Sequence, residues 1–341
     1  MLREDLLQAL QMLGPGISKK ETTAQSASFL LRGKLGCSCN GDLVMRTPMP
    51  AEFQFSGAVE AATLMAFLER IPDTEIKAAL RSGKINIAGK GKKAAFLLDE
   101  NIQAPIEDVE KPTEWHPLDP TFFEVAKHAA GAVSTDDDKF AVTCVYVDSE
   151  QVAATDGLQL VHGEVATPVA SPTLLLGISL KPICGFGLTE IAETPKWVHF
   201  RNKTTKTVAS LRKHKSDDFP SFRKLLKRRG VEFVVPSGIG TAIEVAKVMS
   251  DDDQIVVRLE SGDDKKFITV CGEGQFGRFK ETHPCEFKGE AAEFAIKATL
   301  LKRLSDENAH CELGVGFIRC DSGVETYIVS TSSLNREDSG D

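Results

Sequence analysis

Three similar segments occur along the chain, and in each of them the apolar residues have helical spacing. The first spans residues 3–13, the second 121–133 and the third 241–249, and the last two share the string EVAK. Their apolar residues recur every three or four positions, which places them on one face of a helix. The recurrence therefore predicts an amphipathic helix at the start of each of three repeated units.

Short stretches of alternating apolar and polar residues follow each predicted helix, beginning near Ala27, Lys139 and Gln254. Joints rich in glycine and aspartate separate these stretches, which is typical of antiparallel hairpins. The pattern predicts that each helix is followed by antiparallel strands.

A second helix is expected in every unit, at residues 60–71, 180–191 and 293–304. The middle one should be the weakest, because Gly185 and Gly187 disfavour a helix interior. Further strands close each unit. The order helix, strands, helix, strands predicts an α+β fold with two helices packed on antiparallel sheets in each domain. The expected boundaries are 1–111, 112–232 and 233–334, followed by an acidic tail at 335–341 that we expect to be disordered.

Composition is that of an ordinary soluble chain. Of its 341 residues 42% are hydrophobic and 26% charged, and no apolar run is long enough to cross a membrane. The N-terminal segment carries Glu4 and Asp5, so it is interpreted as an amphipathic helix and not as a signal peptide. We therefore expect a cytoplasmic, nucleoid-associated protein whose eight cysteines are reduced. They include no CxxC pair, so no metal site is expected.

The net charge of −8 bears on nucleic-acid binding. A protein that coats DNA tightly should be basic, because its affinity comes from neutralising phosphates. An acidic chain can still encircle DNA if its inner surface is locally basic and its contacts are weak.

One glycine motif raises the alternative of a nucleotide-binding enzyme. Gly272, Gly274 and Gly277 satisfy GxGxxG, and the string FAIK at 294–297 is similar to the lysine strand of a kinase. However, strand-like residues lie on both sides of the glycines, and too little chain follows Lys297 for the catalytic and magnesium-binding segments of a kinase. A hairpin is the favoured interpretation, with no cofactor and no enzymatic activity.

Three strings carry a resemblance to a known family. ATDGLQL at 154–160, DDFPSFRKLL at 217–226 and TYIVSTSSL at 326–334 resemble, in the same order, motifs of the bacterial sliding clamp, the β subunit of DNA polymerase III. The resemblance covers nearly the whole chain and implies a non-catalytic processivity factor. In that family two three-domain subunits close head to tail into a ring around duplex DNA. The departures noted below would fit a divergent, phage-encoded member.

The resemblance also implies two sets of binding residues. Helices of the family touch DNA phosphates without reading bases. The corresponding candidates are Lys20, Lys127, Lys181, Lys247, Lys297, Lys302 and Arg303. The polymerase and the clamp loader insert a short peptide, with a Gln and apolar anchors, into an apolar pocket. The corresponding lining is Thr155, Gly157, Leu158, Leu160, Pro220, Leu225, Ile328 and Val329.

Two departures alter the expected pocket. Leu158-Gln159 stands where the family has His-Arg, and Ser330-Thr331-Ser332 stands where it has Met-Pro-Met. The partner peptide is therefore expected to differ from the family's usual one. The implied homodimer joint pairs Phe96 and Leu98 of one copy with Val248 and Met249 of the other. The second alternative is a ring-shaped scaffold that binds proteins but not DNA, which the acidic balance favours.

Overall fold

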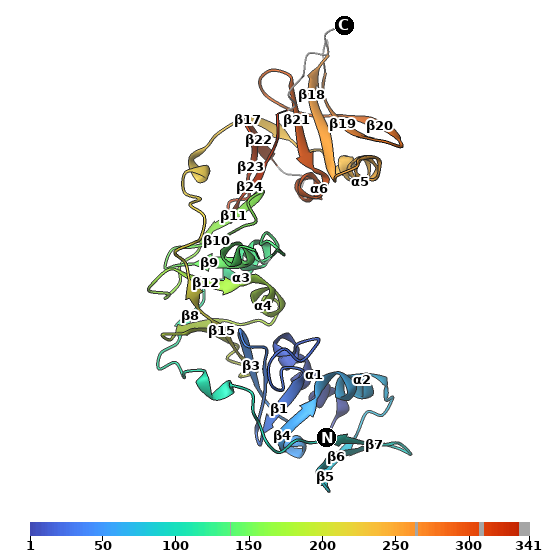
Figure 1. The fold of residues 1–341 in the computed structure, drawn as a ribbon, viewed down its shortest axis with the longest axis vertical. Coiled ribbons are helices and arrows are strands. Elements are labelled where there is room, and N and C mark those ends of the chain that lie inside the picture. Colours follow the sequence, from blue (N-terminus) through green and yellow to red (C-terminus); the bar gives the residue numbers. More distant parts are fainter. Residues whose placement is uncertain (137, 263–264, 307–309, 334–341) are drawn as a thin grey trace. The chain divides into compact units, whose positions relative to one another are not determined.

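The computed structural model describes residues 1–136, 138–262, 265–306 and 310–333. The chain forms two compact units, one of residues 1–152 and 165–219 and the other of residues 153–164 and 220–341. The expected α+β fold with several antiparallel sheets is confirmed (Figure 1). The acidic tail expected at 335–341 lies outside the described residues.

The first unit contains two helix-and-strand repeats. The first repeat comprises α1 (Arg3–Leu13), β1 (Ser28–Arg32), β2 (Leu35–Cys39), β3 (Leu43–Pro48), β4 (Ser56–Glu60), α2 (Ala61–Arg70), β5 (Lys77–Arg81), β6 (Lys84–Ala88) and β7 (Lys93–Leu97). The second comprises β8 (His116–Pro117), α3 (Phe122–Ala129), β9 (Cys144–Val147), β12 (Thr173–Leu176), α4 (Gly177–Leu180), β13 (Glu190–Glu193), β14 (Trp197–Arg201), β15 (Val208–Arg212) and β16 (His214–Lys215). Strand β10 (Gln151–Thr155) begins in this unit and ends in the next.

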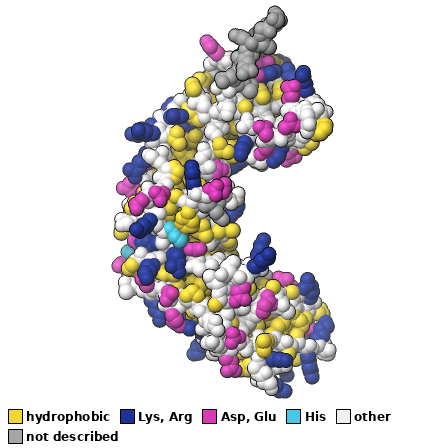
Figure 2. All heavy atoms as spheres, in the orientation of Figure 1, with side chains coloured by type: hydrophobic (Ala, Val, Ile, Leu, Met, Phe, Trp, Pro, Cys, Tyr) yellow, Lys and Arg dark blue, Asp and Glu magenta, His cyan; other side chains and the backbone are white. Residues whose placement is uncertain are grey.

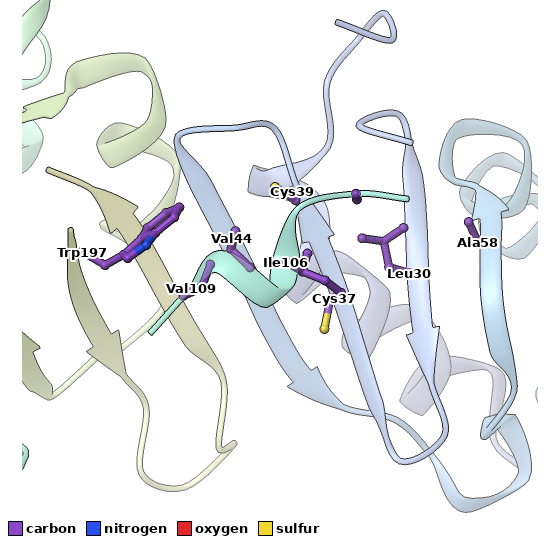
Figure 3. Packing of buried hydrophobic residues seen from close by; sticks show 9 residues of the cluster. Leu30, Cys37, Cys39, Val44, Ala58, Ile106, Val109 and Trp197 are labelled. Carbon is purple, nitrogen blue, oxygen red and sulfur yellow. The ribbon is translucent and has the colours of Figure 1, made fainter. Parts of the chain in front are cut away.

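One eight-stranded sheet, in the order β4-β1-β2-β3-β15-β14-β13-β8, joins these two repeats. Its central joint pairs Met45 with Ala209 and Leu43 with Leu211, all fully buried. The connector between the repeats lies across this sheet, where Ile106 and Val109 pack against Trp197 (Figure 3). The shared sheet and the connector therefore hold the two repeats together as one unit.

The second unit contains the third repeat. Its elements are β11 (Gln159–Glu164), β17 (Val231–Val234), α5 (Gly240–Met249), β18 (Gln254–Ser261), β19 (Lys266–Gly274), β20 (Gly277–Pro284), β21 (Ala292–Lys297), α6 (Ala298–Asp306), β22 (His310–Gly314), β23 (Phe317–Asp321) and β24 (Thr326–Ser330). Four strands form a sheet in the order β20-β19-β18-β21, and β11-β24-β23-β22-β17 are consecutive strands of a nine-stranded sheet. Helices α5 and α6 pack side by side, as do α1 with α2 and α3 with α4 (Figure 1).

Three of the helices expected from the sequence differ from the predicted bounds. Helix α3 ends at Ala129 and not at 133, the second helix of the middle repeat begins before the expected 180–191, and α6 begins only at Ala298. In the middle repeat the helix covers only Gly177–Leu180 and a 3-10 turn to Ile183, because Pro182 lacks an N–H and Gly187 takes a positive φ of 59°. In the third repeat residues 293–297 belong to β21 and not to the helix. Their side chains alternate along the sheet, with Phe294 directly opposite Val257.

The glycines of the GxGxxG motif belong to a hairpin between β19 and β20, as favoured from the sequence. Helix α5 lies so close to β19 that a Cβ on Gly272 would come within 2.1 Å of the Ala246 carbonyl oxygen. Glycine is needed here for close packing of helix on strand. In the part of the chain that the structure describes, no helix is long and apolar enough to span a membrane.

Candidate functional site

The turn between β10 and β11 is organised by one carboxylate. Asp156 Oδ1 accepts hydrogen bonds from the backbone N–H groups of Leu158 and Gln159, at 2.8 and 2.9 Å. Gly157 takes a φ of 92°, which favours glycine, and the Thr155 hydroxyl accepts its N–H at 3.0 Å. The turn leaves the Leu158 side chain 40% exposed. This aspartate–glycine pair therefore presents an apolar residue to solvent on a hydrogen-bonded turn.

The strand register places the next candidate residues on one face of the second unit's sheet. Leu160 of β11 lies directly opposite Ile328 of β24, which in turn lies opposite Arg319 of β23. Directly paired residues of antiparallel strands share a face, so these three side chains form one row. A neighbouring row contains His162, two positions along β11.

The segment at 220–229 crosses this same face. Phe222 is buried and packs on His162, with 5.8 Å between ring centroids. Further along, Arg319 Nη1 donates to the Leu226 carbonyl oxygen at 2.6 Å. Pro220 is exposed and Leu225 is half-buried. The segment therefore contacts this face of the sheet at His162 and Arg319, and Leu160 and Ile328 of the same face are buried.

We use the name outer groove for the candidate site at which Leu158, Pro220 and Leu225 reach the surface and the buried Leu160 and Ile328, 2% and 5% exposed, lie in the sheet. Thr155 and Gly157 support it through the turn. Val329 does not contribute to it, because alternation along β24 places its side chain on the opposite face of the sheet. There Val329 is fully buried, on the face where the α6 residue Arg303 covers its neighbour Tyr327, 4.1 Å from the ring centroid.

Sequence reasoning missed Arg319, Phe222 and His162, which join the segment at 220–229 to the sheet. Arg319 is only 6% exposed and donates to both carboxylate oxygens of Asp321, at 2.8 Å each. Burial acts to raise the pKa of Asp321, but hydrogen bonds from Arg319 and Thr326 outweigh it, and the pKa is lowered. The alternation of polar residues in FIRCD was the only signal of this role in the sequence.

The two departures from the family motifs also have defined places. Gln159 stands where the family has an arginine; its Nε2 donates to Asp156 at 2.9 Å, and its Oε1 accepts from the Tyr327 hydroxyl at 2.9 Å. Gln159 therefore stabilises the turn, while Leu158 is the residue that the turn exposes to solvent. Ser330 donates its backbone N–H to the Leu158 carbonyl oxygen at 2.7 Å, which extends the strand pairing beyond β11.

The candidate DNA-contact residues fall into two groups. Lys20, Lys127 and Lys181 are exposed. Lys247 lies 3.1 Å from Asp253 and Lys302 lies 3.4 Å from Glu244, measured between Nζ and a carboxylate oxygen. Lys297 is half-buried at the end of β21, and Arg303 lies 3.5 Å from Glu325. The carboxylates beside Lys247, Lys302 and Arg303 reduce the positive field that a phosphate would meet.

The candidate dimer residues also divide by exposure. Phe96 and Leu98 are 9% and 4% exposed, and the side chain that β7 presents to solvent is Leu97, at 72%. Val248 on α5 is 83% exposed. Met249 is half-buried against the β19–β20 hairpin, since a Cβ on Gly277 would meet its methyl group at 2.7 Å.

The described side chains form no metal-ligand cluster, and three of the thiols have raised pKa values. Within the described ranges, no three or more His, Cys, Asp and Glu side chains are grouped so that they could hold a metal ion. Burial raises the pKa of the Cys144, Cys184 and Cys285 thiols to about 11, which makes them poor nucleophiles at neutral pH. Lysine and arginine side chains alternate with acidic ones over the face in Figure 2.

Comparison with known proteins places this geometry in a familiar fold. No protein-family model and no curated protein matches the sequence. Among solved structures, the sliding clamp of Bartonella birtlesii bound to griselimycin matches with a TM-score of 0.83, 13% identity and 98% of each chain covered. The β subunit of DNA polymerase III from Thermotoga maritima matches with a TM-score of 0.81, 13% identity and the same coverage.

The sliding clamp of Pseudomonas aeruginosa bound to griselimycin is a third such structure, with a TM-score of 0.80, 14% identity and 98% of each chain covered. Agreement over nearly the full length of all three chains includes all three helix-and-strand repeats. The chain therefore has the three-domain fold of the bacterial DNA polymerase III β sliding clamps.

Proposed function

We propose that the chain is a sliding clamp, a non-catalytic ring of two copies that encircles duplex DNA and tethers a polymerase and its loader. The observation that carries the proposal is the match to solved clamps over 98% of both chains. A ring that encloses DNA needs few tight phosphate contacts to stay on it, so a net charge of −8 is compatible with this function. The exposed Lys20, Lys127 and Lys181 are the strongest candidates for such contacts.

Closure of the ring is proposed to join β7 of one copy to β20 of the other. Both are edge strands of their sheets, and edge strands are the usual sites of pairing between chains. Exposed apolar side chains lie at both places: Leu97 on β7, and Val248 and Phe276 beside β20. Residues 76–98 carry six lysines and arginines and no acidic residue, whereas residues 251–253 are three aspartates. Opposite charges would favour this pairing.

The outer groove is proposed to bind a short partner peptide with apolar anchors. Leu158 is exposed at one end and Leu225 is half-buried in the segment at 220–229, so both can contact a ligand. Changing Leu158 and Leu225 to aspartate should leave ring assembly intact and lower polymerase stimulation about tenfold or more. Unchanged stimulation would remove the groove from the proposal.

The decisive experiment follows retention on DNA. The protein is loaded onto nicked circular DNA by a clamp loader and separated from unbound protein by gel filtration, and the DNA is then cut once. A clamp stays on the circle and is released after linearisation, because its hold is topological. Release at the same rate from circular and linear DNA would contradict the proposal.

The same experiment tests the alternative of a protein-binding ring that does not hold DNA. The carboxylates beside Lys247, Lys302 and Arg303 favour that alternative, because they neutralise the cations expected to meet phosphates. A scaffold of this kind would form dimers and bind peptides in the outer groove. It would not be retained on the circular DNA.

A further inference from the structure

A dense group of cations lies in the segment at 220–229, which is part of the outer groove. Residues 220–230 contain Arg223, Lys224, Lys227, Arg228 and Arg229 and no acidic residue, in a chain whose net charge is −8. All five side chains are exposed. We use the name basic wall for these five residues. Such a local excess of one charge is a feature that binding surfaces use for selectivity.

Contacts within the second unit fix where the basic wall lies. Phe222 is anchored on His162, which places Arg223 and Lys224 at the His162 end of the groove. At the other end the Arg228 guanidinium lies 5.8 Å from the Phe317 ring centroid, and Phe317 pairs directly with Ser330. Leu160 and Ile328 lie between these ends. Cations therefore flank the apolar part of the groove on both sides.

Three carboxylates of the second unit are already engaged by other donors. Asp321 accepts from Arg319 and Thr326, and Asp156 accepts three hydrogen bonds within its own turn. Glu312 accepts the Gly230 backbone N–H at 3.0 Å. In the described ranges no carboxylate forms an ion pair with Arg223, Lys224 or Lys227. These three cations are therefore available to an incoming acidic group.

We propose that the outer groove selects peptides whose apolar anchors are flanked by acidic residues. This inference rests on the proposed function of the groove and adds the chemistry of its partner. Apolar anchors would displace water between Leu158 and Leu225, while flanking carboxylates would meet the basic wall at the rim. A nucleic-acid strand would also satisfy the cations. Leu158 and Leu225, the leucines that reach the surface beside these cations, favour a peptide, because apolar peptide side chains can be buried against them and a sugar–phosphate backbone cannot.

The test uses three labelled peptides with one common core, a glutamine followed by leucine and phenylalanine anchors. Their flanks are aspartate, serine or lysine, and binding is measured by fluorescence anisotropy on the full chain. We expect the aspartate-flanked peptide to bind about tenfold tighter than the serine-flanked one at low salt, and the lysine-flanked one to bind weakest. The advantage should shrink strongly at 500 mM NaCl, where exposed charges are screened within about 4–5 Å.

The double variant Lys224→Glu, Lys227→Glu should reverse the order and prefer the lysine flank. A matched control, Lys203→Glu with Lys206→Glu, makes the same charge change at the same spacing on an exposed loop of the first unit, and should keep the wild-type order. A wild-type order in the Lys224 and Lys227 variant would overturn the inference.

The other outcomes separate this inference from the proposed function. Equal binding of all three peptides overturns the acidic preference and leaves the groove as a peptide site. Failure of every peptide to bind overturns both. Tighter binding of labelled single-stranded DNA, lost in the Lys224 and Lys227 variant, would assign the basic wall to nucleic acid. If acidic peptides bind only after Glu337, Asp338 and Asp341 are changed to amides, the occupant is the chain's own acidic segment.

Discussion

Asp156 shows how much of a site one side chain can organise. Its two carboxylate oxygens hold the N–H groups of Leu158 and Gln159 and the Gln159 side chain. This turn sets the exposure of Leu158, the apolar residue at one end of the outer groove. Hydrogen bonds that backbone N–H groups donate to a carboxylate are among the stronger local interactions in a protein.

Asp156→Ala should therefore lower the free energy of unfolding by about 1–3 kcal/mol, because it leaves these donors without their acceptor. Asp156→Asn keeps an acceptor oxygen and should lose less than half as much. Urea denaturation followed by circular dichroism measures both. Equal losses for the two variants would mean that the charge, and not the acceptor geometry, stabilises the turn.

His199 is a buried titratable residue that the groove does not use. It is fully buried, with Ser210 Oγ at 2.8 Å from Nδ1 and Thr194 Oγ1 at 3.0 Å from Nε2. Burial, followed by the positive charge of Arg46, lowers its pKa to about 4. The native state therefore prefers the neutral ring, whereas the unfolded chain binds a proton near pH 6.5.

The contribution of the neutral His199 ring to the free energy of unfolding should be complete above about pH 6.5. It should be lost progressively as the pH falls toward 4, because the unfolded state then binds more protons. Between pH 7 and pH 5 this amounts to a loss of about 2 kcal/mol in the free energy of unfolding. His199→Gln cannot titrate, so its stability should fall by about 2 kcal/mol less over the same interval. Parallel pH profiles for the two proteins in urea denaturation would contradict this.

At the scale of elements, the connector between the first two repeats acts as a strap across the eight-stranded sheet. Ile106 is 2% exposed in a cluster with Trp197, Val44 and Cys37 (Figure 3). The Ile106 carbonyl oxygen also accepts from Arg46 Nη2 at 2.8 Å. The strap thus adds apolar burial and a hydrogen bond to the strand pairing between β3 and β15.

Ile106→Ala should cost about 2–5 kcal/mol of the first unit's stability, from lost burial and the cavity left behind. The neighbouring Glu107 is a matched control. Its side chain is 74% exposed and paired with Arg32, so Glu107→Ala should change stability by less than about 1 kcal/mol. Urea denaturation reports both, and a small effect of Ile106→Ala would show that the strap does not stabilise the sheet.

The third repeat shows how packing changes the meaning of a motif. The glycines at 272, 274 and 277 satisfy a nucleotide-binding pattern by spacing alone. Their role is to let α5 lie against β19 and to turn the chain into β20. The helix predicted at 293–304 begins only at Ala298 for a related reason. Phe294 and Ile296 pair with β18, and this long-range pairing overrides a local helical pattern.

At the scale of the whole molecule, the proposed dimer makes a direct prediction. Leu97→Asp and Val248→Asp place a charge on side chains that are 72% and 83% exposed, so each monomer should stay folded. Both should weaken association at least about tenfold, because an unpaired charge would be buried at the joint. Ile178→Asp changes an equally exposed apolar residue on α4 and is the control.

Sedimentation velocity over a range of concentrations measures this effect. The expected result is a dimer for the natural chain and the Ile178 variant, and a shift toward monomer for the other two. A natural chain that sediments as a monomer at every concentration would contradict the dimer and, with it, the ring.

The sequence by itself determined the α+β class, the threefold order of helices and strands and the turn at Asp156-Gly157, because these depend on local periodicity and on residues close in the chain. Through the family resemblance it also predicted Leu158, Leu160, Leu225 and Ile328 as lining of one peptide pocket, and this stays a prediction. The domain boundaries expected at 111 and 232 stay a prediction beside two compact units.

Only the tertiary structure decided which face of a strand each residue occupies. A shift of one position reverses that face, and pairing with distant strands sets it. That is why Val329 lies in the core, why Leu97 is exposed in place of Phe96 and Leu98, and why Arg319 and the basic wall meet at the groove.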